Sequence, residues 1–201
     1  WYGKLPALGD FVQRRLPPGF VDQWDEWLQR GLQGLKAAPR RDDQGQDGDD
    51  SDAAFAPVRR FWLAPGVIDA LGWGGLLMPS SDRAGRRFPL TVAQPMATLA
   101  QALAARHWFA SVVAAMRFTL DHAHTLDDFE ECLQALPAPS ASQASSRADA
   151  ALAAAVLPAA AGIDARSAWW LHGAARADDF LVFHGLPPPA ALATLIEAPP
   201  R

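Results

Sequence analysis

The sequence predicts a mixed α/β fold, a single three-layer-like domain whose central, largely antiparallel sheet is covered by helices. The chain has 201 residues, of which 50% are hydrophobic, and this is enough for one sizeable core. Aromatic and apolar runs typical of strands alternate along it with amphipathic stretches typical of helices. Several strand-like runs follow one another with only a turn between them, and this order favours an antiparallel sheet.

The first half of the chain supplies strands and one strong helix. Residues 1–12, WYGKLPALGDFV, are apolar but interrupted by Gly and Pro, which suits an irregular first strand. A helix is expected over residues 19–35, because one face collects Phe20, Trp24, Trp27, Leu28, Gly31 and Leu35. We expect Trp24 and Trp27 to anchor the core. Three more strands are expected at residues 58–65, 73–79 and 87–95.

The second half begins with helices and ends with strands. An Ala-rich helix is expected over residues 99–120, followed by a shorter one that Thr125 caps with Asp128 as its capping-box partner. Residues 137–147 are rich in Pro, Ser and Ala and are expected to form a loop. The chain then offers two strands, 167–173 with Trp169 and Trp170 and 179–187, and a short helix from Pro189.

Charge and cysteine content exclude several classes of function. Residues 40–52 hold six aspartates and two arginines, which accounts for the whole net charge of −4, since the other 16 acids and 16 bases cancel. We expect this stretch to be a mobile acidic surface loop. A body without basic excess is not typical of nucleic-acid binding. The single cysteine, Cys132, excludes an internal disulfide, and no apolar run is long enough to span a membrane. We expect a cytoplasmic protein.

The chemistry-bearing residues form no recognisable catalytic pattern. Residues 121–128, DHAHTLDD, offer metal ligands in His122, His124, Asp127 and Asp128. The two histidines, however, are two positions apart at a helix end and point in different directions. Ser80 or Ser81 with Asp82 lacks the Gly-x-Ser-x-Gly turn of a serine hydrolase. We predict that the chain is not an enzyme and has no catalytic residue, metal or cofactor.

Two short segments combine glycine, aspartate and arginine. Residues 78–90, MPSSDRAGRRFPL, place three arginines between apolar runs, with Asp82, Arg83, Gly85 and Arg86 at the centre. Residues 8–15, LGDFVQRR, repeat this chemistry with Gly9, Asp10, Arg14 and Arg15.

Three interpretations of these segments stay open. In the first, Asp82 and Gly85 form an ordinary turn and the arginines point into water. In the second, the Asp10 carboxylate holds Arg83 or Arg86 in an ion pair that joins the two segments. In the third, the arginines are free to bind a phosphate or carboxylate on a partner.

Beyond these local patterns, the chain resembles the TagF (ImpM) family of the bacterial type VI secretion system. The resemblance rests on WYGKLPALGDFVQRRLPPGFVDQWDEWLQRGL, RFWLAPGV, GLLMPSSDRAGRRFPLTVA and SAWWLHG followed by GLPPP, which occur in the family's order from residue 1 to about residue 189. Ala84 and Arg87 depart from the family pattern.

The resemblance implies a helix-covered α/β sheet and a non-enzymatic role, the post-translational repression of type VI secretion. It implies a cytoplasmic protein that binds the forkhead-associated scaffold protein of that system, in some members beside a threonine kinase and phosphatase pathway. A hydrolase or phosphatase that uses the Asp/Arg cluster, and a structural component of the apparatus, stay as alternatives. The residues expected to bind the partner or to organise the two segments are Gly9, Asp10, Arg14, Asp82, Arg83, Gly85 and Arg86.

The acidic stretch generates a first prediction. Deletion of residues 41–52 should leave the thermal unfolding temperature (Tm) within a few degrees of the original, because the segment contains no apolar residue to bury. Thermal unfolding followed by circular dichroism measures this. A Tm lower by more than several degrees would show that the segment packs against the body.

Overall fold

Seven antiparallel strands form one sheet in the computed structural model, which describes residues 1–37, 57–120, 124–138, 147–157, 166–173 and 176–196. The strand order is β2-β1-β5-β4-β3-β6-β7, and every neighbouring pair is antiparallel. The strands are β1 (Tyr2–Gly3), β2 (Val12–Gln13), β3 (Arg59–Leu63), β4 (Trp73–Met78), β5 (Leu90–Pro95), β6 (Arg166–Leu171) and β7 (Leu181–His184). The predicted mixed α/β fold with an antiparallel sheet is confirmed.

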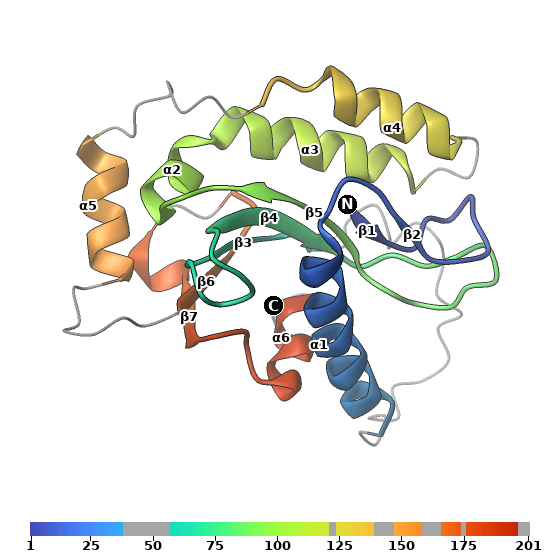
Figure 1. Cartoon of the computed structure of the whole chain (residues 1–201), viewed down its shortest axis with the longest axis horizontal. Coiled ribbons are helices and arrows are strands. Elements are labelled where there is room, and N and C mark those ends of the chain that lie inside the picture. The colour runs from blue at the N-terminus through green and yellow to red at the C-terminus, as the bar shows by residue number, and fades with distance from the viewer. Residues whose placement is uncertain (38–56, 121–123, 139–146, 158–165, 174–175, 197–201) are drawn as a thin grey trace.

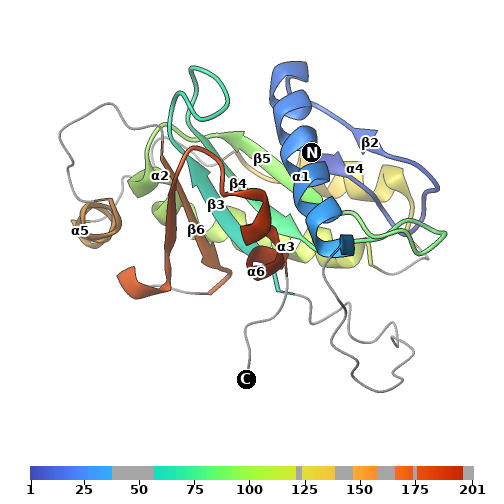
Figure 2. The same ribbon diagram turned by 90° about the horizontal axis from the view of Figure 1, so that it is seen from below.

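Helices cover both faces of this sheet (Figures 1 and 2). The helices are α1 (Pro18–Ala37), α2 (Leu99–Ala104), α3 (Arg106–Phe118), α4 (Leu126–Ala135), α5 (Arg147–Val156) and α6 (Leu192–Ile196), with short 3-10 turns η2 (Ala177–Asp179) and η3 (Pro189–Ala191). Helices α1 and α6 share one hydrophobic cluster with the sheet, while α2, α3, α4 and α5 share the other. Among the described residues, none of the helices has the length and apolarity needed to cross a membrane.

The central strands contribute to both clusters because successive side chains point to opposite faces. In β4, Trp73 and Leu77 belong to the cluster under α1, whereas Leu76 and Met78 belong to the cluster under α3. All six residues of β4 are buried. Gly75 is required there, because a Cβ at this position would lie 2.4 Å from the Phe61 ring. The strand is therefore interior on both sides.

The tryptophans expected in the core are buried and fix α1 against the sheet. Trp24 stacks on Trp169 of β6 with ring centroids 5.9 Å apart, and its indole N–H donates to the Thr91 hydroxyl of β5 at 2.9 Å. The Trp27 indole donates to the Pro187 carbonyl at 2.7 Å. Trp170, the next residue of β6, faces the opposite cluster. Each indole thus has its hydrogen-bond donor satisfied or its ring packed in the core.

One predicted helix needs correction, and one helix was missed. The helix expected over residues 99–120 is two helices that break at Ala105, where α2 ends and α3 begins. Helix α5 was not predicted, because its Ala-rich sequence carries only a weak apolar stripe; Val156 is buried against the α2 side of the core. In contrast, the capping box of Thr125 and Asp128 at the start of α4 is confirmed.

Three of the predicted segments have altered or partly undescribed boundaries. The irregular first strand is a pair of two-residue strands, β1 and β2, that pair with each other. The acidic stretch at residues 40–52 lies outside the described residues. Of the predicted loop at 137–147, residues 137 and 138 have no regular structure, Arg147 begins α5, and the remainder is not described.

Candidate functional site

The loop between β4 and β5, residues 79–89, is organised by the Asp82 carboxylate. One carboxylate oxygen, Oδ1, accepts hydrogen bonds from the backbone N–H groups of Ala84 and Arg86, both at 2.9 Å. Gly85 has φ +74°, a left-handed conformation that glycine adopts without strain, and its N–H donates to the Asp82 carbonyl at 2.8 Å. Asp82 therefore folds the loop around itself as an Asx-type turn.

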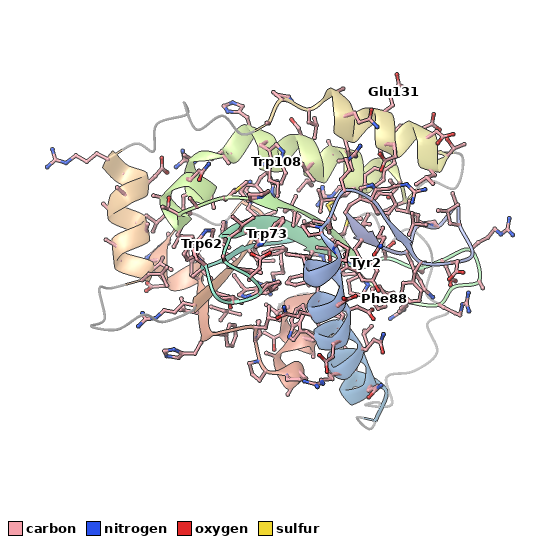
Figure 3. All side chains as sticks on the ribbon, viewed as in Figure 1. Tyr2, Trp62, Trp73, Phe88, Trp108 and Glu131 are labelled. Carbon is pink, nitrogen blue, oxygen red and sulfur yellow. The ribbon has the colours of Figure 1, made fainter. Side chains whose placement is uncertain are left out.

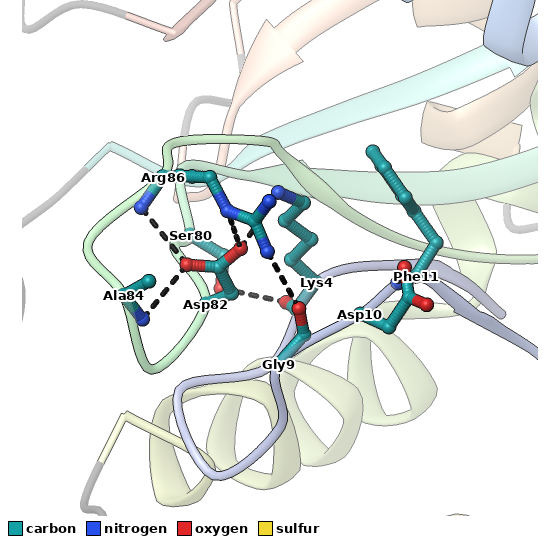
Figure 4. Close-up of polar contacts among 8 residues, drawn as sticks. All are labelled: Lys4, Gly9, Asp10, Phe11, Ser80, Asp82, Ala84 and Arg86. Atoms are coloured by element: carbon teal, nitrogen blue, oxygen red, sulfur yellow. Dashed lines mark hydrogen bonds and ion pairs between the residues drawn. The ribbon is translucent and has the colours of Figure 1, made fainter.

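The second carboxylate oxygen of Asp82 joins this loop to the first segment of the chain (Figure 4). Its Oδ2 accepts from the Lys4 ammonium at 2.8 Å and from the Arg86 Nε at 2.7 Å. The Lys4 and Asp82 side chains are only 7% and 0% exposed, whereas the Arg86 side chain is 64% exposed. A buried ion pair and a surface ion pair thus share one oxygen atom.

Further hydrogen bonds hold residues 4–9 beside the loop. The Arg86 Nη2 donates to the Gly9 carbonyl at 2.7 Å, and the Arg83 backbone N–H donates to the Leu8 carbonyl at 2.9 Å. The Ser80 hydroxyl donates to the Lys4 carbonyl at 2.8 Å. These bonds span more than 70 positions of sequence, so the two segments form one rigid unit.

The charged form of Asp82 is strongly favoured. The hydrogen bond from Lys4 holds the pKa of the Asp82 carboxyl well below its usual range, with further contributions from the backbone and side chain of Arg86. Because the pKa is lower in the folded state, the stabilisation is complete above the unfolded pKa near 4 and is lost as the pH falls below it. Such a carboxylate is a structural anion and a poor general base at neutral pH.

Of the three sequence-based interpretations, the one that pairs Arg83 or Arg86 with Asp10 is wrong about the acid. Arg86 pairs with Asp82, and the exposed Asp10 carboxylate accepts from the Phe11 backbone N–H at 2.8 Å. Asp82, four positions before Arg86 in the same loop, is the acid folded against the guanidinium. Arg83 is exposed and makes no side-chain hydrogen bond or ion pair to the described part of the chain.

Two residues that the sequence did not indicate complete the site, Lys4 and Phe11. Phe11 is 45% exposed although it is aromatic, and it packs edge-on against Phe88 at 4.7 Å between ring centroids and stacks on Tyr2 at 6.2 Å. The Lys4 ammonium lies 4.7 Å from the centre of the Phe11 ring. Tyr2 and Phe88 lie beside each other in Figure 3, at the end of the sheet next to α1. The sequence signal that could have indicated Lys4 is the presence of a lysine within the apolar run WYGKLP.

An exposed surface results, which we call the motif face and define as residues 9–11 and 83–87. All eight residues are exposed, and the Arg86–Gly9 hydrogen bond brings the two stretches together. Arg83, Arg86 and Arg87 outnumber Asp10, so the face is basic. Arg14, predicted as part of the site, is also exposed, and its guanidinium donates to the neighbouring Gln13 carbonyl at 2.9 Å.

Three of the four residues considered for metal binding are engaged elsewhere or not described, and the fourth, Asp127, is exposed. Asp128 caps α4, His124 stacks on Phe118, and His122 lies outside the described residues. Within residues that the structure describes, no group of three His, Cys, Asp or Glu side chains is arranged to hold a metal ion.

The shared Asp82 oxygen generates a stability prediction. Replacing Lys4 with Met should lower the free energy of unfolding by about 3–5 kcal/mol, because it leaves a buried carboxylate without its buried partner. Arg86→Ala should cost only about 1 kcal/mol, since that guanidinium is solvent-exposed. Urea unfolding at pH 7 measures both values.

Arg83→Ala is the matched control, because it removes an exposed arginine of the same loop that has no side-chain partner in the described residues. It should change the free energy of unfolding by less than about 0.5 kcal/mol. Equal losses for Lys4→Met and Arg83→Ala would contradict the role of the buried pair.

Comparison with known proteins places the chain in a family. No match was found among the curated proteins. The solved structure described as PA0076 from Pseudomonas aeruginosa PAO1 is similar, with a TM-score of 0.68 and 28% sequence identity over 100% of this chain and 94% of that one. Residues 1–136 match the family described as the TagF N-terminal domain, type VI secretion system-associated. These residues include both motif segments and most of the sheet, and the chain belongs to the TagF N-terminal domain family.

Proposed function

We propose that this protein represses type VI secretion after translation, by binding the forkhead-associated scaffold protein of the system through the motif face. Membership of the TagF family supports an accessory role in type VI secretion. The scaffold partner follows from the family resemblance of the sequence. One observation carries the proposed binding role. The buried ion pair between Lys4 and Asp82 lies beneath the motif face and holds its two segments together, while the residues of the face itself are exposed.

The composition of the motif face supports protein binding. Aromatic residues and arginines are enriched at the energetic centres of protein interfaces. The exposed Phe11 lies two positions after Gly9, whose carbonyl accepts a hydrogen bond from Arg86. The loop is already ordered by Asp82 in the free protein, so little conformational entropy is lost when a partner binds. Its three exposed arginines suit an acidic segment of the partner.

The geometry gives less support to a hydrolase or phosphatase. Asp82 accepts hydrogen bonds from Lys4, from the Arg86 side chain and from two backbone N–H groups. These bonds stabilise the ionised carboxylate, which is therefore poorly suited to donate or accept a proton. The Ser80 hydroxyl donates to a backbone carbonyl, which is not the activated state of a nucleophile. A structural component of the secretion apparatus is the other alternative. We place the repressor in the cytoplasm, where the scaffold protein acts.

Two substitutions on the motif face test the binding role. The double variant Arg83→Ala/Arg86→Ala should weaken binding to the scaffold protein by roughly 30-fold or more, because arginines are frequent interface anchors. Its free energy of unfolding should fall by only about 1 kcal/mol. Isothermal titration calorimetry and thermal unfolding of the same preparation measure the two effects separately.

Arg30→Ala is the control for this experiment, because Arg30 is an exposed arginine of α1 that also makes a surface ion pair, with Glu26. It should leave the affinity for the scaffold protein unchanged. Unaltered binding by the double variant would remove the motif face as the docking surface.

The repressor role is tested in a host with an active system. Deleting the gene should raise secretion of type VI substrates, and overproducing the protein should silence secretion without lowering transcript levels. Secreted substrate and transcript are measured in the same cultures. Loss of secretion on deletion would favour a structural component instead, and unchanged secretion in both strains would argue against any regulatory role.

A further inference from the structure

Strand β3 carries two successive buried arginines, Arg59 and Arg60, which are 6% and 8% exposed. Since alternate side chains of a strand point to opposite faces, these two guanidinium groups lie on different sides of the sheet. Arg59 faces α6 and Arg60 faces α3. A buried positive charge requires compensation, so the partners of the two residues can be compared directly.

Arg59 is compensated by backbone oxygens. Its Nε donates to the Leu195 carbonyl at 3.1 Å, and its Nη2 donates to the Thr194 carbonyl at 2.8 Å. Both carbonyls belong to α6, which is five residues long, so neither has a partner within its own helix. Two of the Arg59 nitrogens thereby find acceptors, and the same bonds cap the end of α6.

Arg60 lacks such compensation. Its Nε donates to the His172 Nδ1 at 3.1 Å, and its guanidinium carbon lies 4.7 Å from the centre of the Phe109 ring. No carboxylate contacts it in the part of the chain that the structure describes. Its terminal nitrogens have no protein partner there and are not fully sealed from solvent. These nitrogens are the donors of Arg60 that remain for a ligand.

The surroundings of Arg60 are also cationic. Burial, with a contribution from the Arg106 charge, lowers the pKa of Arg60 to about 10. Burial, with contributions from Arg60 and Arg117, lowers the pKa of His172 to about 4. Arg106 and Arg117 are eleven residues apart on α3, about three turns, and so project from the same side of that helix.

The neighbouring acid is already engaged. Asp149 of α5 is buried and pairs with Arg106. Arg117 makes no side-chain hydrogen bond or ion pair within the described residues. Because His172 accepts through Nδ1, its neutral ring carries the proton on Nε2 and offers one more donor. Two positive charges, those of Arg60 and Arg117, are thus left without a balancing anion in the described residues.

We propose that these residues, which we call the Arg60 cluster (Arg60, Arg106, Arg117 and His172), bind a phosphate-type dianion. The planar guanidinium group donates to phosphate oxygens in a fixed fork, and a phosphate carries close to two negative charges at pH 7. Its charge matches the two uncompensated arginines, and its oxygens supply acceptors for the free donors of Arg60 and His172. The cluster lies under α3, on the sheet face opposite α1 (Figure 1).

Thermal unfolding of the full chain with inorganic phosphate tests this proposal. Phosphate should raise the Tm in a saturable way, by roughly 3–6 °C at tenfold above its Kd, compared with chloride at equal ionic strength. Acetate at the same ionic strength should raise it less, because it carries one charge. An equal rise with chloride or acetate, or no rise with phosphate, would overturn the proposal.

Substitutions of the two neighbouring arginines locate the effect. Arg60→Met should abolish the phosphate-dependent rise, while its Tm in chloride should be unchanged or higher, since an uncompensated buried charge is replaced by an apolar side chain. Arg59→Met should lower the Tm in both salts and keep the phosphate response. If Arg60→Met does not fold, the exposed Arg117→Gln makes the same distinction through a reduced response. A phosphate response that survives removal of Arg60, or of Arg117 in that case, would overturn the assignment.

Discussion

The ion pair between Lys4 and Asp82 is the constraint on which the rest of this site depends. Both side chains are buried, so neither charge can be left without the other at acceptable free energy. Lys4 follows β1 directly, and Asp82 lies in the loop between β4 and β5. Pairing them fixes the first segment beside that loop and so supports the short pairing of β1 with β5, which is a single register position.

This constraint also separates the roles of the residues around it. Because Asp82 uses one oxygen for the backbone of its own loop and the other for Lys4 and Arg86, the loop is folded from within. Among the exposed arginines of the loop, Arg86 shares in this arrangement, whereas the Arg83 side chain has no bond to the described residues. Arg83 and the aromatic ring of Phe11 are exposed, and the buried ion pair between Lys4 and Asp82 holds their two segments together. Such preorganisation lowers the conformational entropy that is lost when a partner binds.

The sequence predicted features that follow from a local pattern and failed where a partner or a helix break depends on the tertiary structure. The apolar face of α1 and the capping box of Thr125 are local patterns, and both were predicted correctly. The break at Ala105 carries no Gly or Pro, so nothing in the sequence marks it. Lys4 and Asp82 are 78 positions apart, and their pairing requires the strand order of the sheet, which periodicity does not give. Asp10 was the wrong partner for Arg86, because the choice between Asp10 and Asp82 depends on how the loop folds around Asp82.

Arg59 and Arg60 also have roles that depend on tertiary structure, because these two identical residues face opposite layers of the molecule. What separates them is the alternation of β3, a central strand covered by helices on both sides. On one face, α6 ends where its free carbonyls can accept from Arg59. On the other face, α3 presents Phe109 and Arg106 to Arg60. In this three-layer fold, two successive arginines therefore have different roles: Arg59 caps a helix, and Arg60 is a buried cation without a balancing anion in the described residues. Anion binding at Arg60 and partner binding at the motif face involve different parts of the molecule.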